Sequence, residues 1–223
     1  MMKDIEVLKY VDHTLLKAVA NWEDIKVLCD EAIEYGTASV CVPPCYVKRI
    51  SDEYKGKVNI CTVIGFPLGY QTREVKLVEC KQAVAEGASE VDMVINITDV
   101  KNGDYKKVEE EIRALKEAVG DKILKVIVET CYLTEDEKIK MCEAVTKAGA
   151  DYIKTSTGFG TGGATLEDIR LFKDHIGPNV KIKASGGIRS LEEMKAYIEE
   201  GCSRIGTSSA ISLYKNEKKE SDY

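Results

Sequence analysis

Histidine is scarce in this sequence. Only two of the 223 residues are histidines, His13 and His175, and they lie far apart along the chain. A catalytic zinc or a similar Lewis-acid centre needs a cluster of histidine or carboxylate ligands. We therefore expect no metal site.

Basic residues are not in excess either. Lysine and arginine number 32 against 38 aspartates and glutamates, which gives a net charge of −6. Nucleic acid binding needs a basic surface that neutralises phosphates, so the composition argues against a nucleic acid partner. An anionic small molecule would need a locally positive site instead.

Long apolar runs are absent as well. No stretch approaches the roughly 18 consecutive apolar residues that indicate a membrane span. Residues 1–10 (MMKDIEVLKY) carry charges every few positions and no apolar segment of the kind found in secretion signals. We therefore expect a cytoplasmic protein without membrane contact.

The eight cysteines include no C-x-x-C pair. A chain without a secretion signal keeps its thiols reduced, and most of these cysteines fall inside apolar patterns, where they act as small buried hydrophobes. Cys41 and Cys45 could be read as a thiol site. We favour core packing and a loop cysteine over that interpretation.

A repeated unit organises the whole chain: a segment with helical apolar spacing ends in glycine, and a run rich in valine and isoleucine follows. Seven such runs stand out, at about 39–43, 59–65, 90–96, 123–130, 150–155, 180–185 and 203–207, and a short eighth lies near 11–14. Runs with so little polar content are typical of parallel strands covered on both faces. The pattern predicts an α/β fold, a single-domain (β/α)8 TIM barrel over residues 1–214, followed by a polar tail at 215–223.

An open doubly wound sheet is the alternative fold. Its G-x-G-x-x-G fingerprint after the first strand is missing here. Helix starts agree with the repeat: Thr134 with Glu137, and Ser190 with Glu193, have the spacing of capping boxes.

Two lysines are hard to explain structurally. Lys154 and Lys183 each lie within a β-rich run, and lysine is almost never fully buried without a partner or a purpose. Either one alone could extend to the surface at a strand end. Two on successive strands, with Asp92 on a third, favour chemistry in which a neutral lysine amine attacks a carbonyl. A second ammonium and poor solvation favour the neutral amine.

Glycine-rich segments close three late strands, at Gly158, at Gly186 and Gly187, and at 206–209 (GTSS) before a short helix-like segment. Each could be an ordinary turn. Together they favour a phosphorylated substrate, because barrels often bind phosphate after strands seven and eight.

Six segments, in this order, resemble the deoxyribose-phosphate aldolase family, whose members are class I aldolases. They are 12–16 (DHTLL), 39–43 (SVCVP), 90–96 (EVDMVIN), 154–159 (KTSTGF), 183–189 (KASGGIR) and 206–209 (GTSS). The resemblance spans essentially the whole chain. It implies reversible cleavage of 2-deoxy-D-ribose 5-phosphate to D-glyceraldehyde 3-phosphate and acetaldehyde, with no cofactor, in a homodimer or homotetramer.

The resemblance also implies residue roles. Lys154 would form the Schiff base, Lys183 would be its charged partner, and Asp92 would be the acid and base, supported by Asp12. Positions on the phosphate and substrate side are Thr157, Gly158, Gly186, Gly187, Ser208 and Ser209. Some members end in a tyrosine that assists proton exchange, which Tyr223 would match. Some carry a lysine where this chain has Phe159, so one cation near the phosphate is missing.

Two alternatives stay open on the sequence alone. One is a barrel enzyme that forms a lysine imine on another phosphosugar, such as a transaldolase-like enzyme or a ketose-bisphosphate aldolase. The other is a sugar-phosphate-binding protein that keeps the barrel without catalysis.

Overall fold

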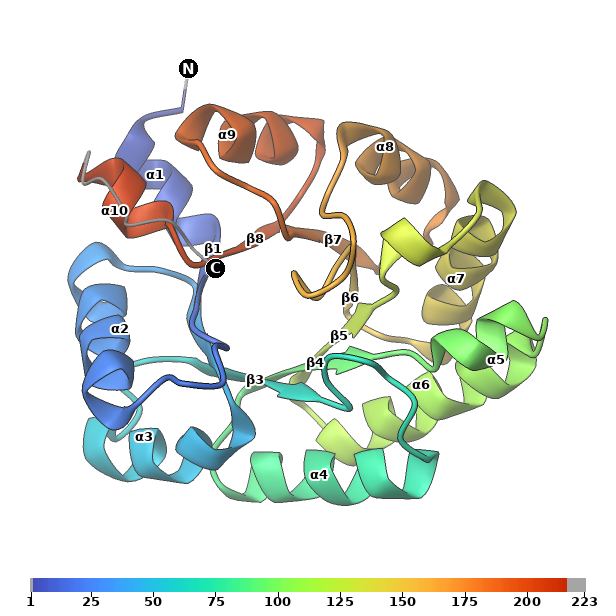
Figure 1. Cartoon of the computed structure of the whole chain (residues 1–223), viewed down its shortest axis with the longest axis horizontal. Helices are drawn as coiled ribbons and strands as arrows, with labels where there is room; N and C mark the ends of the chain where they lie inside the picture. Colours follow the sequence, from blue (N-terminus) through green and yellow to red (C-terminus); the bar gives the residue numbers. More distant parts are fainter. Residues whose placement is uncertain (1, 216–223) are drawn as a thin grey trace.

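The computed structural model describes residues 2–215, which form a closed barrel of eight parallel strands in sequential order (Figure 1). The strands are β1 (Val11–Thr14), β2 (Ser39–Val42), β3 (Ile60–Ile64), β4 (Glu90–Val94), β5 (Ile123–Ile127), β6 (Tyr152–Lys154), β7 (Lys181–Ser185) and β8 (Arg204–Thr207). β1 pairs with β8 and closes the ring. The predicted (β/α)8 barrel is therefore confirmed, including the short first strand.

Helices surround the barrel on its outside (Figure 1). They are α1 (Asp4–Val7), α2 (Trp22–Tyr35), α3 (Val47–Tyr54), α4 (Arg73–Ala85), α5 (Ile97–Lys101), α6 (Tyr105–Val119), α7 (Glu135–Ala148), α8 (Leu166–His175), α9 (Leu191–Glu200) and α10 (Ala210–Tyr214). Short 3-10 turns lie at Leu8–Tyr10, Pro44–Tyr46 and Thr130–Tyr132.

The helix ends follow the local sequence. The Thr134 and Ser190 side chains accept hydrogen bonds from the Glu137 and Glu193 backbone, and each glutamate bonds back to its capping residue. Both predicted capping boxes are confirmed. Gly149 ends α7 with φ +76°, a left-handed conformation that glycine adopts without a Cβ clash.

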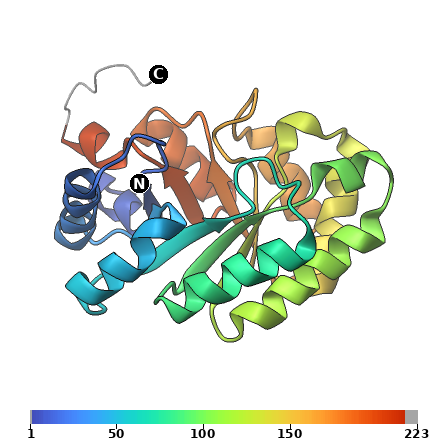
Figure 2. The same ribbon diagram turned by 60° about the horizontal axis from the view of Figure 1, so that its bottom comes forward.

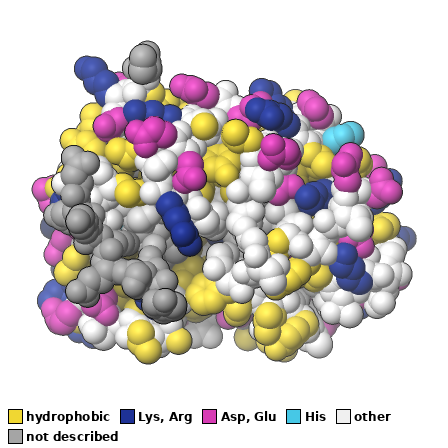
Figure 3. Space-filling model, turned by 45° about the horizontal axis from the view of Figure 1, so that its top comes forward, with side chains coloured by type: hydrophobic (Ala, Val, Ile, Leu, Met, Phe, Trp, Pro, Cys, Tyr) yellow, Lys and Arg dark blue, Asp and Glu magenta, His cyan; other side chains and the backbone are white. Residues whose placement is uncertain are grey.

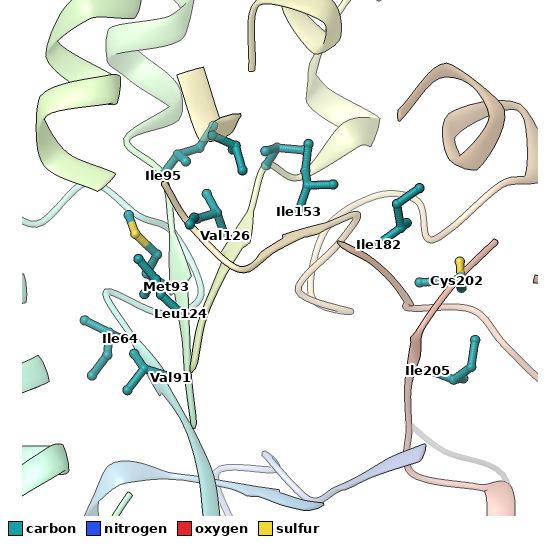
Figure 4. Close-up of a cluster of buried hydrophobic side chains, with 14 of the residues drawn as sticks. Ile64, Val91, Met93, Ile95, Leu124, Val126, Ile153, Ile182, Cys202 and Ile205 are labelled. Atoms are coloured by element: carbon teal, nitrogen blue, oxygen red, sulfur yellow. The ribbon is translucent and has the colours of Figure 1, made fainter. Parts of the chain in front are cut away.

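Alternate strand residues point to opposite sides of the barrel wall, as strand geometry requires. Figure 4 shows one set, including Val91, Leu124, Ile153 and Ile182, packed between the strands and the helices. This outer layer forms the main hydrophobic core. The other set faces the barrel axis, where Cys41, Cys61 and Val63 form a small separate apolar cluster. By the same alternation, Val94 and Ile127 share this side of the wall with the charged residues that form the site described below.

The loops that follow the strands gather on one side of the molecule (Figure 2). Among them, the loop between β6 and α8, drawn in orange, reaches over the barrel axis (Figure 1). On the face shown in Figure 3, basic and acidic side chains are interspersed and form no basic stripe. Within residues 2–215, no helix is long and apolar enough to cross a membrane.

The predicted tail falls almost entirely outside the described residues. Lys215, its first residue, is described, and its ammonium lies 3.3 Å from Glu31 Oε1. The prediction of a polar tail over the rest of 215–223 stays a prediction.

Candidate active site

A charged cluster fills the barrel axis. Asp92, from β4, lies at its centre, and its Oδ2 atom accepts hydrogen bonds from Lys154 Nζ at 2.7 Å and from Lys183 Nζ at 2.8 Å. Asp12, from β1, accepts a further hydrogen bond from Lys183. All four side chains are buried. The four residues that the sequence placed in one catalytic group thus meet around one carboxylate.

A glycine makes room for this cluster. A Cβ at Gly206 of β8 would lie 3.0 Å from Lys183 Cε and 2.8 Å from Ser185 Cβ. The side chain of Lys183 therefore packs against the backbone at position 206, which leaves no room for a side chain there. This close approach explains the glycine of the GTSS segment without any ligand.

Three further charged residues belong to the cluster and were missed by sequence reasoning. Lys125 of β5 lies 2.9 Å from Asp92 Oδ1 and 2.5 Å from Glu90 Oε2. Arg204 of β8 donates to Glu90 at 2.8 and 3.0 Å, and to Asp12 at 2.7 Å. The signal that singled out Lys154, a lysine within a β-rich run, was also present at Lys125 within ILKVI.

The cluster is electrostatically positive. Four bases (Lys125, Lys154, Lys183 and Arg204) meet three carboxylates (Asp12, Glu90 and Asp92). Burial alone would raise the pKa of Asp92, but the three ammoniums together hold it well below its usual value. Burial alone would lower the pKa of Lys183, but Asp12 and Asp92 raise it, so Lys183 stays charged. Lys154 therefore has a permanent cation as a neighbour.

Lys154 also begins a loop that a buried glutamate holds in place. Glu129, just after β5, has φ +55°, an uncommon value for a non-glycine residue. Its carboxylate accepts hydrogen bonds from the Thr157 hydroxyl and from the Thr157 backbone N–H at 3.2 Å. Burial raises the pKa of Glu129. These contacts show that Glu129 fixes the start of the β6–α8 loop.

The loops after β6, β7 and β8 touch one another. A Cβ at Gly186 would lie 3.5 Å from the Cα of Gly158, and Ala164 N–H donates to the Gly186 carbonyl at 3.1 Å. Gly158, Gly186 and Gly187 all have positive φ. Ser209 Oγ lies 3.5 Å from the Ile188 carbonyl, next to Gly187. The structure thus brings the predicted phosphate-side glycines and Ser209 to one rim of the barrel.

Phe159 lies on the same rim. The residue is 57% exposed, and its ring meets that of Phe66 edge to face, with the ring centroids 5.3 Å apart. The position at which some resembling proteins carry a lysine is therefore an apolar contact between two loops here. Tyr223 lies outside the described residues, so the structure does not place it.

Two groups of potential metal ligands occur among the described residues: Cys41 with Cys61 and Asp92, and Asp12 with Cys61 and Glu90, each set within 4.8 Å. Every carboxylate in these groups is already paired with lysine or arginine. His13 is paired with Glu31 at 3.0 Å, and His175 is exposed. Neither histidine is in either group.

Comparison with known proteins decides the family. The sequence pattern of the DeoC/LacD family aldolases matches residues 6–215. The chain belongs to this aldolase family. It is 69% identical over 217 residues to a deoxyribose-phosphate aldolase from Clostridium botulinum (strain Alaska E43 / Type E3), covering 97% of this chain and 98% of that protein. It is 63% identical to one from Clostridioides difficile (strain 630), covering 95% and 96%.

A solved structure agrees with the membership of this chain in the DeoC/LacD family. A tetrameric deoxyribose-phosphate aldolase from Aeropyrum pernix superposes with a TM-score of 0.86 at 32% identity, covering 96% of this chain and 92% of that one. The resemblance inferred from six segments is therefore confirmed. Family membership also disfavours the non-catalytic alternative, since the lysines and Asp92 are all present and in contact.

Proposed function

We propose that this chain is a class I aldolase that cleaves 2-deoxy-D-ribose 5-phosphate reversibly to D-glyceraldehyde 3-phosphate and acetaldehyde. The observation that carries the proposal is the shared carboxylate oxygen of Asp92, which binds both Lys154 and Lys183 inside the barrel. The family and the names of its most similar relatives support the substrate. We assign Lys154 as the nucleophile because it lies at the carboxyl end of β6, where the loops that form the site of a barrel begin.

In this proposal the neutral amine of Lys154 attacks the substrate aldehyde and loses water to give an iminium ion. The iminium accepts the electron pair of the breaking carbon–carbon bond. The carbon on the other side of that bond becomes the carbonyl carbon of the released aldehyde, and its hydroxyl group loses a proton. Asp92 can pass protons between the two lysine nitrogens, since both lie within hydrogen-bond distance of one oxygen. Lys183 and Asp12 complete that proton route. The resulting enamine is protonated, and water releases acetaldehyde.

Borohydride reduction tests the proposal directly. Reduction in the presence of acetaldehyde should leave a stable ethyl adduct on Lys154, which peptide mapping by mass spectrometry locates. A substrate panel separates the rival reactions, because an enzyme for another phosphosugar would not accept acetaldehyde readily as donor. An adduct on Lys183 or Lys125 would reassign the nucleophile, and no adduct at all would contradict the class I mechanism.

Replacing Lys183 by leucine should move the pH profile of imine formation upward. The substitution removes a permanent positive charge beside Lys154, and a neighbouring like charge disfavours protonation of an amine. The measurement is the rate of borohydride-trapped adduct on Lys154 as a function of pH. Lys181→Leu, an exposed position on the same strand, is the control and should leave the profile in place. An unshifted profile for Lys183→Leu would mean that the two ammoniums do not interact.

The phosphate is proposed to bind at the rim formed by Thr157, Gly158, Gly186, Gly187, Ser208 and Ser209. Replacing Ser208 by aspartate should therefore hurt cleavage of the phosphorylated sugar far more than cleavage of 2-deoxyribose. The added carboxylate repels the phosphate dianion, and remote binding energy normally helps to position the reacting carbon. Comparing kcat/KM for the two sugars checks this. Equal losses for both would move the phosphate elsewhere.

No cofactor is needed in this proposal, because the iminium itself is the electron sink. Dialysis against EDTA should leave the cleavage rate unchanged. A loss of activity that a divalent cation restores would show that one of the two thiol and carboxylate groups holds a metal after all.

We further propose that the enzyme acts in the cytoplasm on small molecules, as a homodimer or homotetramer. Light scattering of the purified protein tests the oligomeric state.

A further inference from the structure

The barrel interior contains a pair of thiols that the proposed reaction does not use. Cys41 of β2 and Cys61 of β3 are register partners on adjacent parallel strands, and both are fully buried. Both face the axis, and their sulfur atoms lie within 4.8 Å of each other. Neighbouring strands are about 4.8 Å apart, and the Cα atoms of disulfide-linked cysteines are separated by roughly 4.4–6.8 Å. The backbone spacing therefore suits a disulfide.

The two thiols differ chemically. A hydrogen bond from Cys61 lowers the pKa of Cys41, although burial and the charge of Asp92 act in the opposite direction. Burial and that same hydrogen bond raise the pKa of Cys61 well above its usual value. Burial raises the pKa of Cys29, Cys142 and Cys202 to about 12, as expected for inert core thiols. Cys41 thus differs from these core thiols, and it has a second thiol at its side.

We propose that Cys41 and Cys61 form a redox-sensitive dithiol that hydrogen peroxide converts to a disulfide inside the barrel. The Cys41 thiolate attacks one peroxide oxygen, the O–O bond breaks, and the leaving hydroxide takes up a proton to become water. Cys61 sulfur then attacks the sulfenic sulfur of Cys41. The S–O bond breaks as the S–S bond forms, and the Cys61 proton leaves with the hydroxide as a second water. Peroxide is reduced, and the two thiols are oxidised.

The disulfide would alter the charged cluster directly. Cys61 Sγ lies 3.1 Å from Asp92 Oδ1 and 3.4 Å from Lys125 Nζ. Oxidation removes the Cys61 thiol proton next to Asp92 Oδ1, and it places a covalent S–S bond beside the proposed acid and base. A disulfide in a reducing compartment is typically a reversible sensor rather than a structural link. Activity should therefore fall on oxidation and return on reduction.

This inference rests on the proposed function only for the route of entry and for the effect on activity. An aldehyde that reaches Lys154 must enter the barrel axis, and hydrogen peroxide is smaller than any such substrate. The cross-link itself can be detected without measuring any reaction. A failure of the dithiol and a failure of the aldolase proposal are therefore distinguishable.

The test treats the full-length protein with graded hydrogen peroxide, blocks the remaining thiols, and maps tryptic peptides without reduction. Cys41 falls in peptide 27–48 together with Cys29 and Cys45, and Cys61 falls in peptide 58–73. Tandem mass spectrometry must therefore locate the linked sulfur. Matched variants are Cys41→Ser, Cys61→Ser and, as control, Cys45→Ser, which alters an exposed thiol outside the cluster. Circular dichroism checks the fold of each.

We expect a cross-link between the two peptides that both Cys41→Ser and Cys61→Ser abolish and that Cys45→Ser retains. In the wild type, the lost fraction of activity should follow the cross-linked fraction, and dithiothreitol should restore both. The inference is overturned if Cys41 and Cys61 stay reduced while Cys45 is oxidised. It is also overturned if they reach sulfinic acid without linking, or if a cross-link survives in either serine variant. A cross-link in a protein that forms no borohydride adduct would keep the dithiol and reject the aldolase proposal.

Discussion

Replacing Lys154 by arginine should reduce cleavage of 2-deoxyribose 5-phosphate by about 10⁴- to 10⁶-fold, the size of loss seen when a covalent nucleophile is removed. Arginine keeps a positive charge beside Asp92, so the carboxylate that now receives a 2.7 Å hydrogen bond from Lys154 still has a cation. A guanidinium is never neutral at working pH and cannot form the imine. The expected defect is therefore chemical rather than electrostatic.

Two measurements separate a lost nucleophile from a damaged fold. The thermal unfolding temperature of Lys154→Arg should stay close to that of the wild type, and borohydride should trap no acetaldehyde on the variant. Lys181→Arg is the matched control: it makes the same exchange at an exposed lysine on the neighbouring strand and should keep full activity. If Lys154→Arg retained a trapped adduct, another lysine of the cluster would be the nucleophile.

The fold was largely predictable because its signals are local. Eight β-rich runs separated by helical spacing gave all eight strands, and glycine or capping residues marked the boundaries. Even β1, only four residues long, could be placed because Val11 begins a run that the barrel needs for closure. The errors were at strand ends: the run at 123–130 continues past the strand, which ends at Ile127, because Glu129 turns into a left-handed conformation.

The cysteines show where a sequence pattern reaches its limit. Six of the eight are buried, as expected, but Cys45 is exposed and Cys131 is half-buried. For Cys41 and Cys45 we favoured core packing and a loop position over a shared thiol site. Cys41 is buried and Cys45 is exposed, which agrees with that interpretation. The partner of Cys41 is Cys61, on the next strand. Only the register between β2 and β3 brings these two together, and register is not visible in one sequence.

The candidate site could be predicted only in part, because contacts between side chains of different strands also depend on register. Lys154, Lys183 and Asp92 were found because each is a charge in an apolar run. Lys125 has the same signal, but no family motif drew attention to it, and Glu90 and Arg204 sit at strand starts where polar residues are ordinary. Their importance depends on side chains converging across β4, β5 and β8. That convergence is a property of barrel closure.

Lys125 carries the largest stability effect that we expect. Its side chain is fully buried and lies 2.5 Å from Glu90 and 2.9 Å from Asp92. Replacing it by methionine keeps a similar volume but leaves two buried carboxylates short of a cation. Removing one partner of a buried ion pair typically destabilises a protein by about 3–5 kcal/mol. Chemical denaturation at neutral pH should show a loss of this size in the free energy of unfolding.

The pH dependence of that loss distinguishes charge from packing. Burial would raise the pKa of Asp92, and among the ammoniums that hold it down Lys125 contributes most, so the pKa of Asp92 must rise in Lys125→Met. A carboxylate whose pKa is lowered by folding stabilises the folded state at pH values above its unfolded-state pKa, which is about 3.9. That contribution is lost as the pH falls from there through the folded-state pKa. The stability gap between wild type and variant should therefore be full at neutral pH and shrink as the solution is acidified.

Lys48→Met is the matched control for Lys125→Met, because Lys48 pairs with Asp52 on an exposed helix surface at 3.0 Å. An exposed pair one helical turn apart contributes only about 0.3–0.5 kcal/mol. The control should therefore lose little stability, and little of that should depend on acidification. If Lys125→Met lost no more than Lys48→Met, or if its deficit were constant with pH, the three ammoniums would not be holding the carboxylates of the barrel axis in their charged form. The electrostatic account of the site, and with it the permanent cation beside Lys154, would then have to be abandoned.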